Sequence, residues 1–344
     1  MDRIQDKKRI LLVNVNWLGD VLFSTPAIRA IRKAFTSSSI SCMIVPRVKE
    51  ILEGNPNIDE LIIYDEEGMH KSLLAKVKFI AQLKKKKFDL VILFHRSFTR
   101  TLICYLAGIP TRVGYSTFKR AFLLTQKIKP QIGSMHKIDY LSNIVNAIGI
   151  ETDNSFCDFF IQDSNRVFVD KFLFNAGIKQ DDTIVVLNPG GNWQPKRWMK
   201  ENFARLADKL ITDFNLKVII SGGLKDIDLV GQITKLMNQK PVVACGRLTL
   251  KQLGALFEKA KLVISADSSP LHIAASLGTK IIGLYGPTSV DITGPRGRGY
   301  IKIIQKSIGC KIPCYDSECI DFRCMKVIIA KDVLDEVYKA IDLH

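Results

Sequence analysis

Residues 9–28 read RILLVNVNWLGDVLFSTPAI, and this stretch decides the fold of the first half of the chain. Its first eight residues, 9–16, form a short apolar run that is typical of a buried parallel strand. Gly19 and Asp20 follow as a turn, and Thr25-Pro26 can cap and start a helix. Strand, turn and helix in this order begin the alternation of a doubly wound sheet.

The same alternation continues through both halves of the chain. Further strands are expected at 40–45, 60–64 and 90–94, and in the second half at 183–187, 217–221, 262–265 and 280–285. Apolar residues at helical spacing lie between most of these strands. A polar seam at 151–165 separates the halves, and 344 residues suit two domains of ~100–200 residues each. The predicted fold is α/β, with two Rossmann-like parallel sheets and a cleft between them.

Composition excludes several broad classes of protein. With 47% hydrophobic and 24% charged residues, the chain is an ordinary globular mixture rather than a disordered or fibrous one. No apolar run approaches the ~20 residues that span a bilayer, and residues 1–9 lack the apolar core of a secretory signal, so we expect a cytoplasmic protein. The chain has no G-x-G-x-x-G after its first strand and no Walker sequence, which argues against nicotinamide-dinucleotide and P-loop sites.

Positive charge is concentrated in the first half. The net charge is +16, and residues 1–150 hold 24 Lys and Arg against 12 Asp and Glu. Between Arg96 and Lys137 there are eight basic residues and no acidic one. Such a field attracts nucleic acid, a membrane surface or a phosphorylated or carboxylated substrate, unless it serves only as a basic, soluble surface. Nucleic acid is disfavoured because no helix-turn-helix or aromatic-interleaved basic motif accompanies the charge.

Asp20 is the first candidate for chemistry. It follows the first strand, at the edge of the sheet where ligands bind in such folds. A carboxylate there can accept a proton from a substrate hydroxyl. The alternative is that Asp20 caps the next helix, because aspartate is a favoured capping residue.

Three segments that follow strands of the second half can bind an anion. Glycines let backbone N–H groups approach a phosphate, cations supply charge, and helix N-termini add free N–H groups. The candidates are Asn188, Gly190, Gly191, Lys196 and Arg197 in the first segment, Asp267, Ser268, Ser269 and His272 in the second, and Gly286 and Thr288 in the third. Alternatively, the first segment is a plain turn with solvated cations and His272 is structural. Three such segments along one sheet edge favour an anion site.

Four cysteines lie close together near the carboxyl end of the chain: Cys310, Cys314, Cys319 and Cys324. Four thiolates within fifteen residues can bind a structural zinc ion, although the tight C-x₂-C pairs of common zinc sites are missing. Free thiols and disulfides are the alternatives, and a reducing cytoplasm disfavours disulfides.

Taken together, these segments resemble the lipopolysaccharide heptosyltransferase family, glycosyltransferase family 9, whose members have the GT-B fold and use ADP-activated heptose. The resemblance covers nearly the whole chain. It rests on an ordered set of motifs: 10–16, Leu18-Gly19-Asp20, 25–28, 55–60, 112–115, Asn188-Pro189-Gly190, Lys196-Arg197-Trp198, 267–274 and 284–288. The most specific of these is 267–274, and the cysteine cluster ending in Cys324-Met325 also resembles one carried by part of the family.

The resemblance implies a role for each matching residue. Asp20 corresponds to the general base that acts on the acceptor hydroxyl. Lys196 corresponds to the lysine that contacts the donor diphosphate. Asp267 and His272 correspond to positions beside the nucleotide sugar and its phosphates.

The resemblance also implies a division of labour between domains. Residues 1–160 would form an acceptor-binding Rossmann-like domain and residues 161–325 a nucleotide-sugar-binding one, with a helix in 326–344 packing back towards the first domain. In the second domain, an acidic residue after the turn 221–223 would hold the nucleotide ribose. Asp226 and Asp228 compete for that role.

The implied reaction is an inverting transfer of heptose from ADP-heptose to the inner core of lipopolysaccharide. Lys196, the glycine turn and the helix that begins at Ser268 would stabilise the leaving diphosphate, so we expect no cofactor and no catalytic metal. The acceptor is an anionic, lipid-linked oligosaccharide, and the residues expected to bind it are Arg96, Arg100, Arg112 and Arg120.

This reaction also implies where the protein works and which alternatives remain. An acceptor anchored in lipid predicts peripheral contact with the cytoplasmic face of the inner membrane, and no nucleic acid is expected as a partner. The alternatives are a related transferase that uses another nucleotide sugar, a catalytically silent glycolipid-binding relative, and a nucleic-acid-binding protein.

Overall fold

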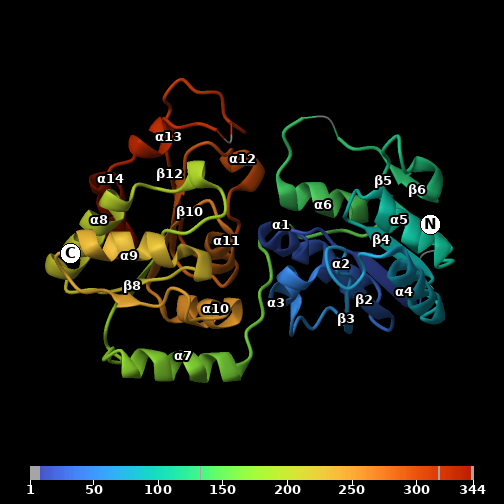
Figure 1. Ribbon diagram of the computed structural model, residues 1–344, viewed down its shortest axis with the longest axis horizontal. Coiled ribbons are helices and arrows are strands. Elements are labelled where there is room, and N and C mark those ends of the chain that lie inside the picture. Colours follow the sequence, from blue (N-terminus) through green and yellow to red (C-terminus); the bar gives the residue numbers. More distant parts are fainter. Residues whose placement is uncertain (1–7, 132, 317, 342–344) are drawn as a thin grey trace. The chain divides into compact units, whose positions relative to one another are not determined.

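The computed structural model describes residues 8–131, 133–316 and 318–341, and the chain divides into two compact units, 1–160 and 161–344. The division falls inside the polar seam at 151–165. Figure 1 shows each unit as a sheet flanked by helices. Among the helices of the described ranges, none is long and apolar enough to cross a membrane.

The first unit is built on a six-stranded parallel sheet with the strand order β3-β2-β1-β4-β5-β6. Its strands are β1 (Arg9–Val13), β2 (Ser39–Ile44), β3 (Glu60–Ile63), β4 (Leu90–Leu93), β5 (Thr111–Tyr115) and β6 (Gln126–Ile128). Ile10 pairs with Ile40 on one side and with Leu90 on the other, which places β1 at the centre of the sheet. Its apolar run is buried because a central parallel strand is covered on both faces.

Helices connect these strands and cover the sheet. They are α1 (Leu18–Phe23), α2 (Thr25–Ala34), α3 (Lys49–Leu52), α4 (Leu73–Lys85), α5 (Phe98–Leu106) and α6 (Lys137–Asn146), with short 3₁₀ turns at Pro46–Val48 (η1) and Ala121–Leu123 (η2). Pro26 occupies the first turn of α2, where its missing N–H costs nothing. The helix start predicted at Thr25-Pro26 is confirmed.

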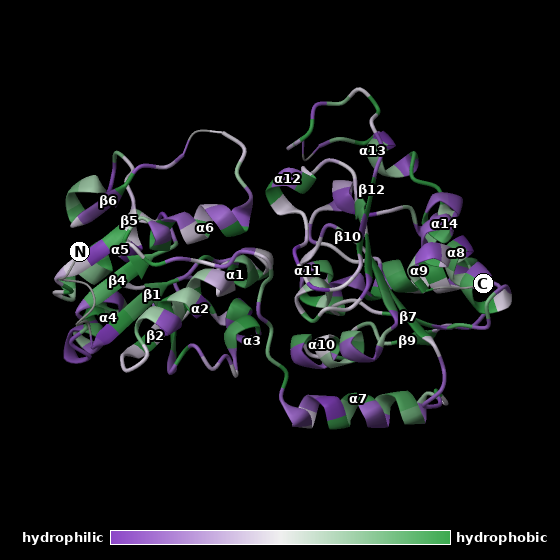
Figure 2. Ribbon diagram, turned by 180° about the vertical axis from the view of Figure 1, so that it is seen from behind, coloured by the Kyte–Doolittle hydropathy of each residue, from purple (hydrophilic) through white to green (hydrophobic). Residues whose placement is uncertain are grey.

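The second unit repeats the topology, with the strand order β12-β11-β10-β7-β8-β9. Its strands are β7 (Ile184–Asn188), β8 (Lys217–Ile220), β9 (Val242–Val243), β10 (Leu262–Ala266), β11 (Ile281–Tyr285) and β12 (Ile301–Gln305). All pairings are parallel, and β7 lies between β10 and β8. Figure 2 shows hydrophobic strands in both sheets, as expected of sheets covered on both faces. The predicted α/β class with two Rossmann-like parallel sheets is confirmed.

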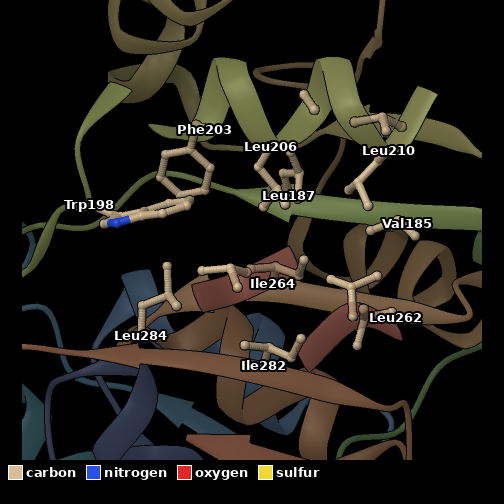
Figure 3. Close-up of a cluster of buried hydrophobic side chains, with 14 of the residues drawn as sticks. Val185, Leu187, Trp198, Phe203, Leu206, Leu210, Leu262, Ile264, Ile282 and Leu284 are labelled. Carbon is tan, nitrogen blue, oxygen red and sulfur yellow. The ribbon is translucent and has the colours of Figure 1, made fainter. Parts of the chain in front are cut away.

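The helices of the second unit flank its sheet. They are α7 (Asp163–Asn175), α8 (Lys200–Thr212), α9 (Ile227–Leu236), α10 (Leu250–Lys259), α11 (Ser269–Ser276), α12 (Val290–Thr293), α13 (Arg323–Lys326) and α14 (Ala330–Ile341), with 3₁₀ turns at Gln194–Lys196 (η3) and Leu224–Asp226 (η4). Residues of α8, α9, α13 and α14 pack with the strands in a large apolar core. Figure 3 shows Phe203 and Leu206 of α8 facing Leu187 and the neighbouring strands. Trp198 lies at the edge of this core, 2% exposed, and holds the start of α8 in place.

The terminal helix α14 packs within the second unit. It buries Val333, Val337 and Ala340 in the core of that unit. Its contacts there include α8 and β11. Because its apolar side chains are buried in this core, α14 is part of the second unit. Packing of a helix in 326–344 towards the amino-terminal domain stays a prediction.

Candidate active site

Each sheet reverses its strand order once, between β1 and β4 in the first unit and between β7 and β10 in the second. In open parallel sheets, ligands bind beyond the carboxyl ends of the strands at this reversal. The segments that directly follow the reversal strands contain Asp20 in the first unit and residues 189–198 and 267–272 in the second. The candidate site residues therefore lie where this topology places ligands.

Asp267 is the centre of a polar cluster just after β10. Its Oδ2 accepts a hydrogen bond from Lys196 Nζ at 2.7 Å and lies 3.4 Å from Thr293 Oγ1. Its Oδ1 lies 3.3 Å from His272 Nε2 and 3.2 Å from the Tyr285 hydroxyl. The Asp267 side chain is only 4% exposed, so this carboxylate is enclosed by donors rather than by water.

The cluster keeps Asp267 ionised. Burial by itself would raise the pKa of Asp267, but the hydrogen bond and charge of His272, followed by those of Lys196, hold that pKa well below its usual range. Burial, together with the Asp267 charge, raises the pKa of Tyr285 well above 10.0, so its hydroxyl stays protonated. A carboxylate in this state anchors cations and does not act as a base.

Lys196 is positioned by the rigid end of its loop. Lys196 ends the 3₁₀ turn η3, which contains buried Pro195. Two residues after Lys196, Trp198 Nε1 donates to the Ile328 carbonyl at 2.7 Å. The Lys196 side chain keeps 26% of its surface exposed although its Nζ is paired. Its Nζ also lies 5.9 Å from the centre of the Trp193 ring. The ammonium is thus fixed in direction and accessible to a ligand.

Asp226 fastens the turn after β8 to the loop after β7. Its Oδ2 accepts the Gly223 N–H at 2.9 Å, and its Oδ1 lies 3.7 Å from an Arg197 Nη atom. A Cβ at Gly190 would lie 2.3 Å from Asp226 Oδ2, so a larger residue there would displace this carboxylate. A Cβ at Gly191 would meet open space. Asp228, the other ribose candidate, is exposed in the first turn of α9.

The start of α11 offers backbone donors next to this cluster. Ser268 is its N-cap residue and makes no capping hydrogen bond with its side chain, whose Oγ instead lies 3.0 Å from Ser265 Oγ. Ser269 is the first helical residue and is half-buried. The helix N-terminus is therefore left without a side-chain cap, and its positive end faces the same loop as Asp267.

Two predicted donor contacts also have structural roles. Asn188 is 2% exposed: its Nδ2 donates to Ser265 Oγ at 3.2 Å and its Oδ1 accepts from Ser221 Oγ at 3.2 Å, so its side chain links β7 to β10 and to the end of β8. A Cβ at Gly286 would lie 2.5 Å from Met325 Sδ, so this glycine makes room for α13. The Asn188 side chain is therefore engaged within the sheet, and donor binding by the backbone of Gly286 stays a prediction.

Thr288, in the same turn as Gly286, remains a candidate. It is 7% exposed, and its Oγ1 is buried without a hydrogen-bond partner among the described residues. Buried hydroxyls are normally satisfied, so Thr288 stays a predicted donor contact.

Asp20 lies in a helix and not on the predicted turn, but it remains a candidate for the general base. It lies within the short helix α1, whose N-cap is Trp17, and so is neither on an open turn nor a capping residue. Its side chain is half-buried, and within the described ranges no hydrogen bond or ion pair engages its carboxylate. Aspartate in the first turn is favoured by the helix dipole. The position of Asp20 is thus set by the backbone of α1, while its carboxylate stays available.

Arg100 and Arg120, predicted to bind the acceptor, are structural residues. Arg100 is 1% exposed, donates to the Asn14 carbonyl at 3.2 Å and pairs with Glu66 at 2.9 Å. Arg120 is 0% exposed and donates to the carbonyls of Tyr115 and His95, with its Nη1 2.6 Å from the latter. Buried guanidinium groups with these partners cannot reach an oligosaccharide, so this prediction is wrong for both.

The other two predicted acceptor residues differ from each other. Arg112 donates through Nε to the Leu123 carbonyl at 2.6 Å and also binds the Ile109 carbonyl, so it too closes loops of its own chain. Arg96 is exposed, and its Nη1 lies 3.4 Å from the Tyr140 hydroxyl. Of the four arginines, Arg96 alone presents its guanidinium to solvent.

Comparisons with known proteins agree with this geometry. Residues 76–321 match the sequence profile of glycosyltransferase family 9 (heptosyltransferase). This match covers well over half of the chain.

The chain belongs to glycosyltransferase family 9.

Individual relatives are distant but span the whole chain. Lipooligosaccharide heptosyltransferase 2 of Campylobacter jejuni is 24% identical over 330 residues, which cover 94% of this chain and 96% of that protein. The crystal structure of a family 9 glycosyltransferase from Veillonella parvula covers 98% of both chains with a TM-score of 0.86 at 27% identity.

A heptosyltransferase structure supports the same fold. The structure of Escherichia coli ADP-heptose lps heptosyltransferase II covers 97% of this chain and 98% of its own, with a TM-score of 0.80 at 22% identity. The predicted GT-B arrangement of two parallel sheets is confirmed by this likeness, and the chain is a glycosyltransferase.

In this family 9 chain the four carboxyl-terminal cysteines are free thiols. Cys310 is exposed and Cys314, Cys319 and Cys324 are half-buried. Burial raises the pKa of Cys324 above its ordinary value. Across 8–131, 133–316 and 318–341, no three His, Cys, Asp or Glu side chains are placed to hold a metal ion. The zinc alternative therefore has no preformed site there.

Sequence reasoning missed two members of the Asp267 cluster. Tyr285 ends β11 and Thr293 ends α12, and neither was predicted as a site residue, although Tyr285 lies in the motif 284–288. A signal existed for Tyr285, because it is a hydroxyl-bearing residue at the carboxyl end of a strand adjacent to β10. Nothing in the sequence marks Thr293, which follows Tyr285 by eight residues and reaches Asp267 only through the loop between them.

Proposed function

We propose that this glycosyltransferase moves heptose from ADP-heptose to the inner core of lipopolysaccharide by a single inverting displacement. The curated relatives include lipopolysaccharide core and lipooligosaccharide heptosyltransferases, which supports this substrate class. The reaction would form one bond, from the acceptor oxygen to the anomeric carbon, and break one, from that carbon to the diphosphate of ADP.

The observation that carries the proposal is the ion pair between Lys196 and Asp267. It holds an accessible ammonium at the reversal point of the second sheet, beside the open N-terminus of α11. Negative charge grows on the leaving diphosphate during the displacement, and a fixed cation with free backbone N–H groups stabilises such charge without reorganising. Thr288 Oγ1 and the open space at Gly191 are further positions for donor atoms.

Asp20 would act as the general base. As the acceptor hydroxyl attacks, its proton passes to the Asp20 carboxylate, while the electron pair of the broken bond leaves with ADP. An aspartate of ordinary pKa, about 3.9, is a weak base, so proton transfer is late in the reaction. In the second unit, Asp226 is assigned to the ribose because its carboxylate lies against Gly190.

No divalent metal is assigned to the reaction, because Lys196, Arg197 and the α11 N-terminus already supply positive charge to the diphosphate. The acceptor is an anionic, lipid-linked oligosaccharide, and Arg96 is the residue proposed to meet it. The protein would work in peripheral contact with the cytoplasmic face of the inner membrane. Nucleic acid is not a proposed partner.

The decisive experiment is thermal stabilisation by donors. Wild-type protein is heated with ADP-heptose, ADP, UDP-glucose or GDP-mannose at equal concentration, each with and without EDTA. We expect ADP-heptose to raise Tm most, since a ligand that binds only the folded state stabilises it in proportion to its affinity. EDTA should leave the shift unchanged.

A matched pair of variants ties that shift to the site. Lys196→Ala should abolish most of the stabilisation, whereas Lys225→Ala, an exposed lysine of η4, should keep it. A larger rise in Tm with UDP-glucose or GDP-mannose than with ADP-heptose would show that the donor is that nucleotide sugar and not ADP-heptose. A shift that EDTA removes and Mg²⁺ restores would contradict the metal-free assignment.

A further inference from the structure

Helix α4 carries two separate apolar faces, although a surface helix needs only one. Phe79 and Leu83 are buried in the core of the first unit. Leu73, Leu74 and Val77 lie on a different side of the helix and are 78%, 65% and 54% exposed. Within the described ranges, nothing covers this second face.

A group of aromatic residues extends the exposed apolar surface. Phe98 begins α5, and its ring centre lies 6.4 Å from that of Phe122 in η2. Phe122 is 71% exposed, and Phe118, in the turn before η2, is 101% exposed. Aromatic side chains of this size are rarely left in water without a function.

Topology places the two groups on one side of the unit. The connections from β3 through α4 to β4 and from β4 through α5 to β5 progress across the sheet in the same direction. Because such crossovers are right-handed, α4 and α5 cover the same face, and they contact each other. Leu73 and Phe98 begin their helices, so both lie towards the carboxyl ends of the strands, the edge that also carries Asp20.

The chain segment that carries this surface is almost all positive in charge. Residues 69–137 hold fifteen Lys and Arg against a single acidic residue, Asp89. Asp89 is itself engaged, because its carboxylate accepts the backbone N–H groups of Lys8 and Arg9. The exposed cations among them are Lys71, Lys78, Lys84, Lys85, Lys87, Arg96, Lys119, Lys127 and Lys129.

We propose that this surface, formed by Leu73, Leu74, Val77, Phe98, Phe118 and Phe122 with the lysines around them, docks the protein on an anionic lipid bilayer. Apolar side chains would enter the boundary between headgroups and acyl chains, and lysines would bind lipid phosphates. The proposal extends the proposed function, since it brings the Asp20 edge of the sheet to an acceptor that is anchored in lipid.

Charge complementarity favours a bilayer over a protein partner. Flexible lysines spread around separate apolar tips suit a fluid, anionic surface, whereas a protein interface is enriched in arginine and depleted of lysine. Several lysines near an anionic bilayer together give useful affinity even where each apolar insertion is shallow.

The test is co-sedimentation with vesicles, in the absence of nucleotide and acceptor. We expect the full chain to bind vesicles of phosphatidylcholine mixed with phosphatidylglycerol and to bind pure phosphatidylcholine far less. The triple variant Leu73→Ser, Leu74→Ser, Phe118→Ser should lose about tenfold or more of this binding. A control variant with three exposed apolar residues of the second unit replaced, Phe174→Ser, Val167→Ser and Leu236→Ser, should bind like wild type.

Folding and self-association are followed in parallel. Unchanged Tm and circular dichroism of the triple variant would show that lost binding is not lost folding. Equal vesicle binding by the triple variant and wild type would overturn the proposal. So would a wild-type dimer that the triple substitution dissociates, because the surface would then belong to a second copy of the chain. Since no donor is present, failure of this test is distinct from failure of the proposed function.

Discussion

The two reversal points of the molecule share a topology and differ in how they treat their carboxylate. In the first unit, Asp20 follows the central strand β1 and is engaged by no hydrogen bond or ion pair of the described residues. In the second unit, Asp267 follows β10 and is enclosed by four donor groups at 4% exposure. Asp20 follows the first strand of its unit and Asp267 follows the fourth strand of the other, so the two reversal points hold one available and one fully occupied carboxylate on different strands.

This difference teaches that the surroundings of a carboxylate at a reversal point decide what it can do. An unengaged carboxylate can take a proton from an incoming hydroxyl. An enclosed one with a strongly lowered pKa is a fixed negative charge that orients Lys196 and His272. Acid–base work and donor positioning are accordingly assigned to different units of the chain.

Removing the available carboxylate should have the largest effect. We expect Asp20→Asn to lower kcat by about 10³- to 10⁴-fold, because general-base catalysis is lost while the shape of the side chain is kept. Donor-dependent thermal stabilisation should remain, since Asp20 takes no part in the second unit. The measurement is steady-state turnover with the ADP-heptose donor and a soluble, deacylated acceptor.

Glu67→Gln is the matched control for this prediction. Glu67 is an exposed carboxylate of the same unit, in the loop after β3, so its replacement removes the same charge from the same region. It should leave kcat within about twofold of wild type, as expected for a surface substitution. Equal rates for Asp20→Asn and wild type would show that Asp20 is not the base and that the comparison between the two carboxylates has no catalytic meaning.

Removing the enclosed carboxylate should act first on stability. We expect Asp267→Asn to lower the free energy of unfolding by about 3–5 kcal/mol at neutral pH, because Lys196 and His272 lose the charge that they are oriented towards. Urea unfolding measures this difference. The donor-induced rise in Tm should shrink as well, since Lys196 would no longer be fixed.

The pH dependence of that difference follows from the direction of the Asp267 shift. Its folded-state pKa lies below the ordinary value of about 3.9, so its contribution to stability is complete above pH 4 and is lost as the pH falls towards the folded-state value. The gap between wild type and Asp267→Asn should therefore be constant from pH 5 to 7 and narrow below about pH 4. A gap that stays constant down to acid unfolding would contradict the ionised, enclosed state.

Much of the fold could be predicted because buried parallel strands are written as continuous apolar runs. The runs in β1, β4, β7 and β10 were recognised in this way. Strand β5, with the sequence TRVGY, was missed because arginine and glycine interrupt its apolar character. It becomes a strand through pairing with β4, which local sequence does not encode.

The acceptor arginines show where sequence reasoning fails for a site. Charge patterning treats every arginine of the basic segment as solvent-facing, but Arg100 lies on the same side of α5 as buried Ile103 and Cys104. Its spacing of three and four residues from them was a usable signal of burial. Arg120 carried no such signal, because the fold brings its partners together: the carbonyls of Tyr115 and His95 and the Thr101 hydroxyl.

The smallest effect on activity is expected from replacing Arg96, an exposed residue of the first unit. Arg96→Ala should raise the KM for the soluble acceptor by about tenfold and leave the donor KM and Tm unchanged, because an exposed guanidinium contributes little to folding but can bind an anion bidentately. Lys127→Ala is the matched control, since it removes an exposed charge of the same acid-free segment from the edge strand β6. Equal changes in KM for both variants would mean that the acceptor senses only the general positive field of the unit. A change confined to Arg96 would place the acceptor at the carboxyl edge of β4, beside the strand that leads to Asp20.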